Sequence, residues 1–248
     1  MNAGGDPAVL RAVELSVSFG DTTVLAPVTF AVAPGELIAV VGPNGAGKST
    51  LFKALAGFID HEGDVVLHGE RCHHLERQAI AYIPQQSDLD LRFPISVAEV
   101  VMAGRRRFHG LRMRPTRADH LRVAECLSAV DLDDLGARSL ATLSGGQVQR
   151  VMLARALAQE ADVLLLDEAL SGVDARHVDE LISLFGDLCA NGTAILVSSH
   201  DLPLVKSRFA RCLTVNGRLV GDGPPERELN GARLEGVFTA RSNGGAPS

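Results

Sequence analysis

The sequence has no Trp, a single Tyr and only four Cys among its 248 residues. So few aromatic rings leave little surface on which unpaired bases could stack, and a net charge of -6 disfavours a protein that coats nucleic acid. The cysteines, Cys72, Cys126, Cys189 and Cys212, lie far apart and form no Cys-x-x-Cys pair. We therefore expect no nucleic-acid partner, no disulfide framework and no zinc finger.

Long apolar runs are also missing. No stretch reaches the roughly 18 residues that a membrane-spanning helix needs. The first residues, MNAGGDPAVLRAVELSV, lack the basic flank and apolar centre of a signal peptide. We expect a chain that remains in the cytosol. Its length and its 46% apolar content suit one large domain, or one domain that carries a smaller lobe.

Short apolar segments predict strands in the first and last thirds of the chain. LRAVELSVSFG and TTVLAPVTFAV are neighbours rich in Val, Leu and Phe, and GELIAVVG, GDVVLHGE and AIAYIP follow them. DVLLLDE and TAILVSSH are apolar almost throughout, as expected for parallel strands that are covered on both faces. LTVNGRLV predicts a hairpin with a two-residue turn at Asn216-Gly217, and a frayed tail is expected after about Gly221.

The middle of the chain is predicted to be helical. SVAEVVMAGRRR begins with Ser96 and has Glu99 three residues later, the capping box of a helix start, and TRADHLRVAECLSAV offers Thr116 and Asp119 at matching positions. We therefore predict a single α/β domain over 1–248. Its core and antiparallel β edge would span about 8–85 and 151–220, its helical lobe about 86–150 and its tail about 221–248.

GPNGAGKS matches the phosphate-binding pattern G-x-x-x-x-G-K-[ST] between a predicted strand and a predicted helix, as the pattern requires. The glycines let successive N–H groups face the phosphates, and the following helix directs its positive end there. Lys48 adds a full charge, and the Ser49 hydroxyl is placed to hold Mg²⁺. A glycine-rich turn that matches by chance is the alternative. The residues expected at the nucleotide are Gly42, Pro43, Asn44, Gly45, Ala46, Gly47, Lys48, Ser49 and Thr50.

VLLLDE adds two acidic residues to this prediction. Its apolar residues bury a strand, so that Asp167 and Glu168 emerge at its carboxyl end, where open α/β sheets bind ligands. Asp167 would help to hold Mg²⁺, and Glu168 would be the general base that polarises the attacking water. The alternative is a pair of acids that caps a helix.

LSGGQVQRVMLARAL combines a small hydroxyl, two glycines and a long helix, which would also accommodate a γ-phosphate. Its first five residues match the signature motif of the ATP-binding cassette ATPases, and the chain resembles that family over nearly its whole length. The resemblance implies a P-loop NTPase fold with a RecA-like core, hydrolysis of ATP with Mg²⁺, and two copies packed head to tail. Ser144, Gly145, Gly146 and Gln147 of one copy would then close over the nucleotide in the P-loop of the other.

The same resemblance assigns further residues. Phe19 lies where the family stacks an aromatic ring on adenine, with a core Phe as the alternative. Gln85 matches the glutamine that contacts magnesium and the attacking water, although Gln86 beside it also fits. Asp174 in SGVD matches the aspartate that crosses the dimer interface. His200 matches the histidine that contacts the γ-phosphate, with a structural histidine as the alternative.

The chain departs from the family pattern at Ala169, where the family usually has Pro. Proline would fix its own φ and restrict Glu168 before it, so alanine loosens this turn. We expect catalysis to survive this change. The segments YIPQQSDLDLRFPISVAEVVMAGR and GVDARH are most similar to the ATPases of manganese, zinc and iron uptake systems.

That similarity implies an importer subunit on the cytoplasmic face of the plasma membrane. Its partners would be a second copy of itself, an integral membrane permease and, indirectly, an extracytoplasmic substrate-binding protein. Importers of haem, siderophores or cobalamin have similar loops, and an exporter cassette is a further alternative. Soluble cassette ATPases of DNA repair carry long coiled coils and ribosome-acting ones carry two cassettes, and neither is found here. A non-catalytic nucleotide binder is favoured only by Ala169.

Two polar clusters invite other interpretations. HGERCHHLER brings His68, Cys72, His73 and His74 together, but it lies between two predicted edge strands, so a solvated loop is favoured over a metal sensor. RRRFHGLRMRPTR is expected to form a solvated surface of the lobe, with contact to lipid headgroups or to the permease as the alternative. Its arginines are Arg105, Arg106, Arg107, Arg112, Arg114 and Arg117.

Overall fold

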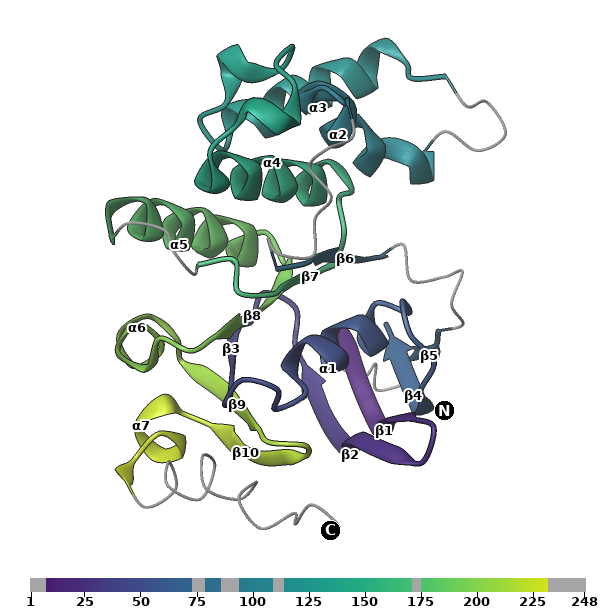
Figure 1. Ribbon diagram of the computed structural model, residues 1–248, viewed down its shortest axis with the longest axis vertical. Coiled ribbons are helices and arrows are strands. Elements are labelled where there is room, and N and C mark those ends of the chain that lie inside the picture. Colours follow the sequence, from purple (N-terminus) through teal and green to yellow (C-terminus); the bar gives the residue numbers. More distant parts are fainter. Residues whose placement is uncertain (1–7, 73–78, 86–93, 109–113, 171–174, 232–248) are drawn as a thin grey trace, which may run out of the picture.

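The computed structural model describes residues 8–72, 79–85, 94–108, 114–170 and 175–231 (Figure 1). The strands are β1 (Leu10–Phe19), β2 (Thr22–Val32), β3 (Leu37–Val41), β4 (Glu62–Leu67), β5 (Glu70–Arg71), β6 (Ile80–Ile83), β7 (Val163–Leu166), β8 (Ala194–Ser199), β9 (Arg211–Val215) and β10 (Leu219–Gly223). The helices are α1 (Lys48–Leu55), α2 (Val97–Ala103), α3 (Arg117–Ser128), α4 (Gly145–Ala158), α5 (Ala175–Ala190), α6 (Leu202–Arg208) and α7 (Pro225–Glu228). In this part of the chain, no helix is long and apolar enough to cross a membrane.

Two sheets form the body of the protein. The larger has six strands in the order β10-β9-β3-β8-β7-β6, in which β9, β3, β8, β7 and β6 are parallel and β10 is antiparallel. The smaller has four antiparallel strands in the order β2-β1-β4-β5. This arrangement confirms the predicted α/β fold with a parallel core and an antiparallel β edge.

The parallel strands are buried on both faces, as their continuous apolar sequences predict. On β3, Ile38 and Val40 pack in one core cluster with α1 and the antiparallel sheet, whereas Ala39 and Val41 pack in the other with α4 and α5. Helix α1 contacts β1, β2 and β6, so it lies between the two sheets. The phosphate-binding loop that precedes α1 is therefore fixed by the packing of both sheets.

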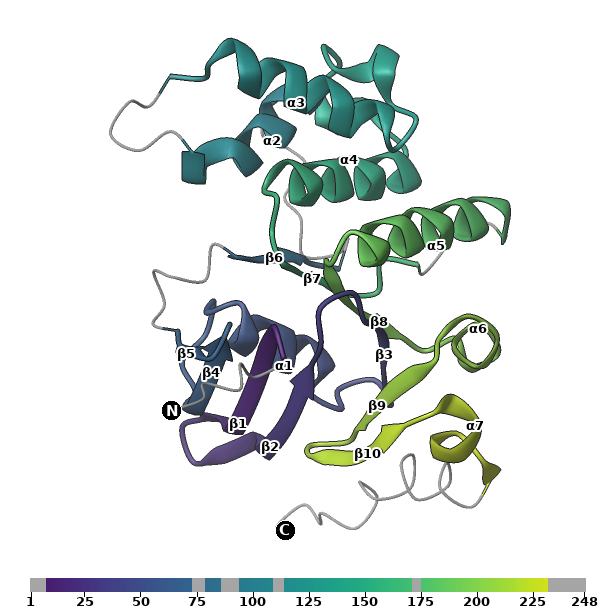
Figure 2. The ribbon, with the colours of Figure 1, turned by 180° about the vertical axis from the view of Figure 1, so that it is seen from behind.

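Helices α2, α3 and α4 pack together at one end of the molecule, and Figures 1 and 2 show α5 lying between them and the sheet. The predicted capping boxes are confirmed: Ser96 accepts from the N–H of Glu99, and Thr116 from that of Asp119. Helix α4 continues to Ala158, well beyond the expected end of the lobe near 150, because its apolar face packs against both α2 and the sheet. It therefore joins the lobe to the core.

The arginine-rich segment is not uniformly solvated, and the expectation was wrong for Arg105. This side chain is 9% exposed, and its Nε donates to Asp119 Oδ1 at 3.0 Å. One of its terminal nitrogens donates to the carbonyl oxygen of Ala158 at 3.0 Å and lies 2.9 Å from Glu160 Oε1. Arg105 thus links the start of α3 to the end of α4, whereas Arg106, Arg114 and Arg117 are exposed.

We expect Arg105→Ala to destabilise the protein by about 3–5 kcal/mol, because it leaves the buried Asp119 without its cation. The exposed neighbour Arg106 is a matched control, and its replacement by alanine should change the free energy of unfolding by less than about 0.5 kcal/mol. Urea denaturation measures both values. Equal, small losses in the two variants would contradict a structural role for Arg105.

The hairpin of β9 and β10 differs from the prediction in its turn. Val215 pairs with Leu219, so the turn contains three residues rather than two. Gly217, at φ 63°, donates its N–H to the carbonyl oxygen of Ala46 at 2.8 Å and accepts from Ala26 N–H at 2.7 Å. These hydrogen bonds to the phosphate-binding loop and to β2 stabilise the three-residue turn. Because their partners are distant in the chain, a local sequence pattern could not predict them.

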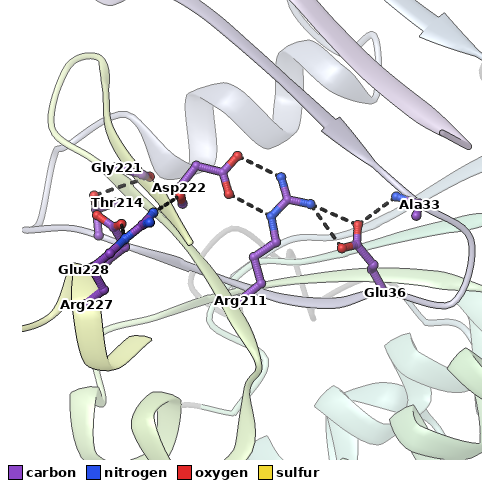
Figure 3. A network of polar contacts seen from close by, with 8 residues as sticks. All are labelled: Ala33, Glu36, Arg211, Thr214, Gly221, Asp222, Arg227 and Glu228. Carbon is purple, nitrogen blue, oxygen red and sulfur yellow. Dashed lines mark hydrogen bonds and ion pairs between the residues drawn. The ribbon is translucent and has the colours of Figure 1, made fainter. Parts of the chain in front are cut away.

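The predicted start of the frayed tail, at about Gly221, is too early. Strand β10 extends to Gly223, α7 follows, and Leu229 is buried beneath it. The hairpin is tied to the turn before β3 by Arg211, which donates two hydrogen bonds of 2.7 Å to Asp222 and lies 3.0 Å from Glu36 (Figure 3). Glu36 in turn accepts from the N–H of Ala33 at 2.7 Å. This network explains why polar sequence near 221 is ordered.

The His/Cys segment begins after β4 and includes β5. Within the described residues, no group of three or more His, Cys, Asp or Glu side chains is arranged to hold a metal. The Nε2 of His68 lies 3.1 Å from Asp162 Oδ2, just before β7, and both side chains are largely exposed. Cys72 is a partly exposed thiol. His73 and His74 lie outside the described residues.

Candidate nucleotide site

The predicted functional residues follow strands that are neighbours in the large sheet. The phosphate-binding loop follows β3, His200 follows β8, the acidic pair follows β7 and Gln85 comes two residues after β6. Because these strands are adjacent and parallel, their carboxyl ends meet at one edge. A cavity of about 510 Å³ opens there, and its lining is Val24, Asn44, Gly45, Ala46, Gly47, Lys48, Ser49, Thr50, Gln85, Glu168 and His200.

The loop backbone is shaped by glycines that no other residue could replace without strain. A Cβ on Gly42 would lie 2.0 Å from the carbonyl oxygen of Val215, and Gly47 has a φ of 97°. Gly47 is the N-cap of α1 and supplies no side chain to the helix end. The first N–H groups of α1 therefore face the cavity without a side-chain partner, which favours a bound anion.

Lys48 is only 6% exposed, and its Nζ donates to the carbonyl oxygens of Gly42 at 2.8 Å and Pro43 at 3.1 Å. Burial lowers the pKa of Lys48, and the nearby carboxylates of Glu168 and Asp167 oppose that shift. The side chain is folded back onto its own loop. A phosphate in the cavity would replace these neutral acceptors with charged ones, which form stronger hydrogen bonds with an ammonium group.

Asp167 is 2% exposed, and both of its carboxylate oxygens are held by hydroxyl groups. Ser198 Oγ donates to Oδ1 at 2.6 Å, and Tyr82 Oη donates to Oδ2 at 3.2 Å. Sequence reasoning missed both partners. Two serines at the end of the otherwise apolar segment AILVSS were the available signal, since a hydroxyl at the carboxyl end of a core strand faces the ligand edge.

Glu168 is held from two sides in an unusual backbone conformation. Its φ is 52°, in the left-handed region that costs a non-glycine residue about 1–3 kcal/mol unless the surroundings enforce it. Its N–H donates to Ser198 Oγ at 2.8 Å, and its Oε2 accepts from Gln85 Nε2 at 2.7 Å. The predicted base and the predicted glutamine are thus in direct contact. Ala169 follows as a buried residue.

The signature residues do not line the phosphate cavity of their own chain. Ser144 caps α4 by accepting from the N–H of Gln147, so the first N–H groups of the helix, at Gly145 and Gly146, point out of its end. Ser144, Gly146 and Gln147 instead line a separate cavity of about 170 Å³ between α4 and α5. The two glycine-rich turns of one chain therefore present two distinct anion-attracting surfaces.

Phe19 and His200, the other predicted site residues that the structure describes, lie at different cavities. Phe19 ends β1 with 57% of its surface exposed, so it is not a core Phe. It borders a shallow cavity next to Phe58 and not the phosphate cavity. His200 lines the phosphate cavity, and the following Asp201 caps α6 by accepting from Leu204 N–H at 2.9 Å. Asp174 and Gln86 lie outside the described residues.

The oxygen atoms near Lys48 suit Mg²⁺. Mg²⁺ prefers hard oxygen ligands and usually takes one or two carboxylates together with substrate phosphates and water. Asp167 supplies a carboxylate whose hydrogen-bond partners are neutral hydroxyl groups, and the Ser49 hydroxyl lies at the start of α1 on the cavity wall. These residues fit the ion, and Gln85 could add an amide oxygen.

Comparison with known proteins agrees with this geometry. A family model described as ABC transporter matches residues 25–171. The manganese transport system ATP-binding protein MntB of Listeria monocytogenes is 36% identical, over 90% of this chain and 93% of its own. The zinc transport system ATP-binding protein TroB of Treponema pallidum is 38% identical, over 85% of this chain and 79% of its own.

A solved structure of an ABC transporter in an inward-facing conformation is 26% identical and has a TM-score of 0.80. The alignment covers 94% of this chain and 89% of that one. The family match, the relatives and the fold agree with a nucleotide site at the carboxyl edge of the sheet. The chain therefore belongs to the ABC transporter family, as an ATP-binding cassette ATPase.

Proposed function

We propose that this ATPase powers a prokaryotic importer of manganese, zinc or iron ions. Relatives that match about 85–90% of the chain are named as ATP-binding proteins of manganese and zinc transport systems, which is the observation that carries the proposal. ABC ATPase subunits act with a membrane permease. The finer assignments proposed here are uptake, a location at the cytoplasmic face of the plasma membrane, and an extracytoplasmic protein that delivers the metal to the permease.

The chain acts as one ATPase domain over 1–248, and two copies bind ATP between them. Support comes from the separation of the two glycine-rich turns, since Ser144 and its neighbours lie outside the phosphate cavity of their own chain. In a head-to-tail dimer the exposed N–H groups at the start of α4 reach the γ-phosphate held by the partner. The proposed role of Asp174 is at the same interface, and that of Phe19 is to stack on the adenine of the ATP bound in the phosphate loop of the same chain.

The polar residues at the nucleotide site have separate proposed tasks. The loop N–H groups and Lys48 bind the β- and γ-phosphates, and His200 contacts the γ-phosphate from the end of β8. Ser49, Asp167 and Gln85 would hold Mg²⁺, which offsets the negative charge of the phosphates when bound. Glu168 accepts a proton from the attacking water as that water approaches the γ-phosphate. The hydrogen bond from Gln85 keeps the Glu168 carboxylate oriented.

Hydrolysis in this scheme depends mainly on positioning and charge. The protein contributes fixed dipoles and cations at the carboxyl edge of a rigid sheet, so little reorganisation is needed as the transition state forms. After cleavage, the separated phosphate and ADP repel each other, and the contacts across the dimer weaken. The dimer opens and passes this motion to the permease through the region around Gln85.

The proposal is tested with the protein co-purified with its membrane permease and reconstituted into vesicles. We expect the ATPase rate to rise when the extracytoplasmic binding protein is added loaded with Mn²⁺, Zn²⁺ or iron, and to change little when it is added empty. Stimulation only by haem-, siderophore- or cobalamin-loaded proteins would replace the proposed cargo. A rate that no loaded binding protein changes would refute the importer.

A further inference from the structure

The signature helix α4 reaches the loop that carries Glu168 through the side chain of Gln149. Its Nε2 donates to the carbonyl oxygen of Ala169, and it lies 3.4 Å from the carbonyl oxygen of Glu168. Gln149 is partly buried and follows the signature glycines by about one helical turn. A single side chain thus joins the motif that faces the partner's nucleotide to the backbone of the proposed base.

This contact adds a third partner to the contacts of Glu168 with Ser198 and Gln85. Ser198 Oγ accepts its N–H from β8, Gln85 Nε2 donates to its carboxylate, and Gln149 holds the carbonyl side. A left-handed residue returns to an ordinary conformation unless its neighbours prevent this. The first two partners belong to the core, whereas Gln149 belongs to a helix that packs with α2 and α3 of the lobe.

Packing alone does not fix this loop on the side that faces α4. Ala169 and Gln149 both line the cavity of about 170 Å³ between α4 and α5, together with Leu166 and Phe185. A gap beside a backbone segment removes the close contacts that would otherwise resist its movement. On this side, the hydrogen bonds donated by Gln149 therefore restrain the Glu168–Ala169 backbone, because the small side chain of Ala169 lies next to a cavity.

We propose that Gln149 is a positioning residue that makes the aim of the Glu168 carboxylate depend on the position of the signature helix. The inference rests on the proposed role of Glu168 as the base. When α4 moves relative to β7, the amide of Gln149 moves with it, and the Glu168–Ala169 peptide is pulled or released. Water attack is then fastest only while the lobe holds the position seen here or one close to it.

The test compares Gln149→Leu and Gln149→Glu with Gln159→Leu in the full-length protein. Leu and Glu have similar volumes to glutamine but cannot donate to a carbonyl oxygen. Gln159 is a matched control, because it caps the carboxyl end of the same helix and its Nε2 donates to the carbonyl oxygen of Ile80 at 3.0 Å, at the start of β6. We expect kcat to fall about 10- to 100-fold in both Gln149 variants and to stay unchanged in Gln159→Leu.

Two further readouts separate positioning from a loss of structure. The Kd for Mg-ATP should change by less than about twofold in the Gln149 variants, since Gln149 does not touch the nucleotide. In a Glu168→Gln background, Gln149→Leu should still form the ATP-bound dimer on gel filtration, because its effect passes through the base alone. An unchanged kcat, a parallel loss of ATP affinity, or loss of that dimer would each overturn the proposal.

This outcome is distinguishable from failure of the proposed function. If Glu168→Gln retains full turnover, the assignment of the base is wrong whatever Gln149 does. If Glu168→Gln is inactive and the Gln149 variants match the control, only the role of Gln149 is refuted.

Discussion

Glu168→Gln is expected to lower ATP turnover by about 10²–10⁴-fold while ATP still binds, because the amide keeps the shape of the carboxylate but cannot accept the proton of the attacking water. The variant should accumulate an ATP-bound dimer that does not reopen. Phosphate release measures the rate, and gel filtration with Mg-ATP measures the dimer.

The exposed Glu62 on β4 provides the control for this experiment, since it is the same residue type on the antiparallel sheet. Glu62→Gln should hydrolyse ATP at the original rate. Full turnover in Glu168→Gln would show that another group acts as the base. An inactive variant that also fails to bind ATP would mean that Glu168 has a structural role, for which its contacts with Ser198 and Gln85 would be responsible.

Lys48→Ala should remove most of the stabilisation that ATP provides. At ATP concentrations near 100 times the Kd, binding adds about 2.7 kcal/mol to stability, or a rise in melting temperature of about 5–10 °C for a protein of this size. Loss of a charge-assisted hydrogen bond to phosphate costs about 1.5–3 kcal/mol, so the variant should show little of this rise. Differential scanning fluorimetry with and without Mg-ATP measures it.

Without nucleotide, Lys48→Ala should melt at the same temperature as the original protein or higher, because burial already disfavours the charged form of this side chain. Lys53, at the other end of α1, is the control, and Lys53→Ala should retain the full effect of ATP. If both variants respond equally to ATP, Lys48 does not bind phosphate. If Lys48→Ala is unfolded without ATP, its role is structural.

The parts of the site that could be predicted are those that depend on local sequence. A phosphate cradle needs glycines and a lysine at fixed spacing before a helix, so GPNGAGKS identified it. Asp167 and Glu168 could be placed because a continuous apolar strand carries whatever follows it to the ligand edge of a parallel sheet. The capping boxes at Ser96 and Thr116 are also local patterns.

Other features depend on contacts between distant segments and could not be read from single stretches. Ser198 holds both Asp167 and Glu168, although it comes thirty-one and thirty residues after them in the chain. Arg105 is buried because Asp119 and the end of α4 converge on it, whereas its sequence context of successive arginines suggested a solvated surface. The turn of the last hairpin depends on its bonds to Ala46 and Ala26.

The native cysteines leave the protein well suited to crosslinking. Burial raises the pKa of Cys189 to about 11 and that of Cys212 to about 12, and it also raises the pKa of Cys126. Few thiolates form on these residues near neutral pH, so they react slowly. Replacing the partly exposed Cys72 with serine should therefore give a protein whose native cysteines contribute little to crosslinking.

The central claim is that ATP is bound between the phosphate loop of one copy and the signature turn of another. In that background, with Glu168→Gln, one chain would carry Asn44→Cys and a second, differently tagged chain Ser144→Cys. Asn44 is preferred to Gly45, whose φ of 73° disfavours a side chain. We expect a disulfide between the two tagged chains with Mg-ATP and none without nucleotide. Failure to form it under saturating Mg-ATP would contradict the account.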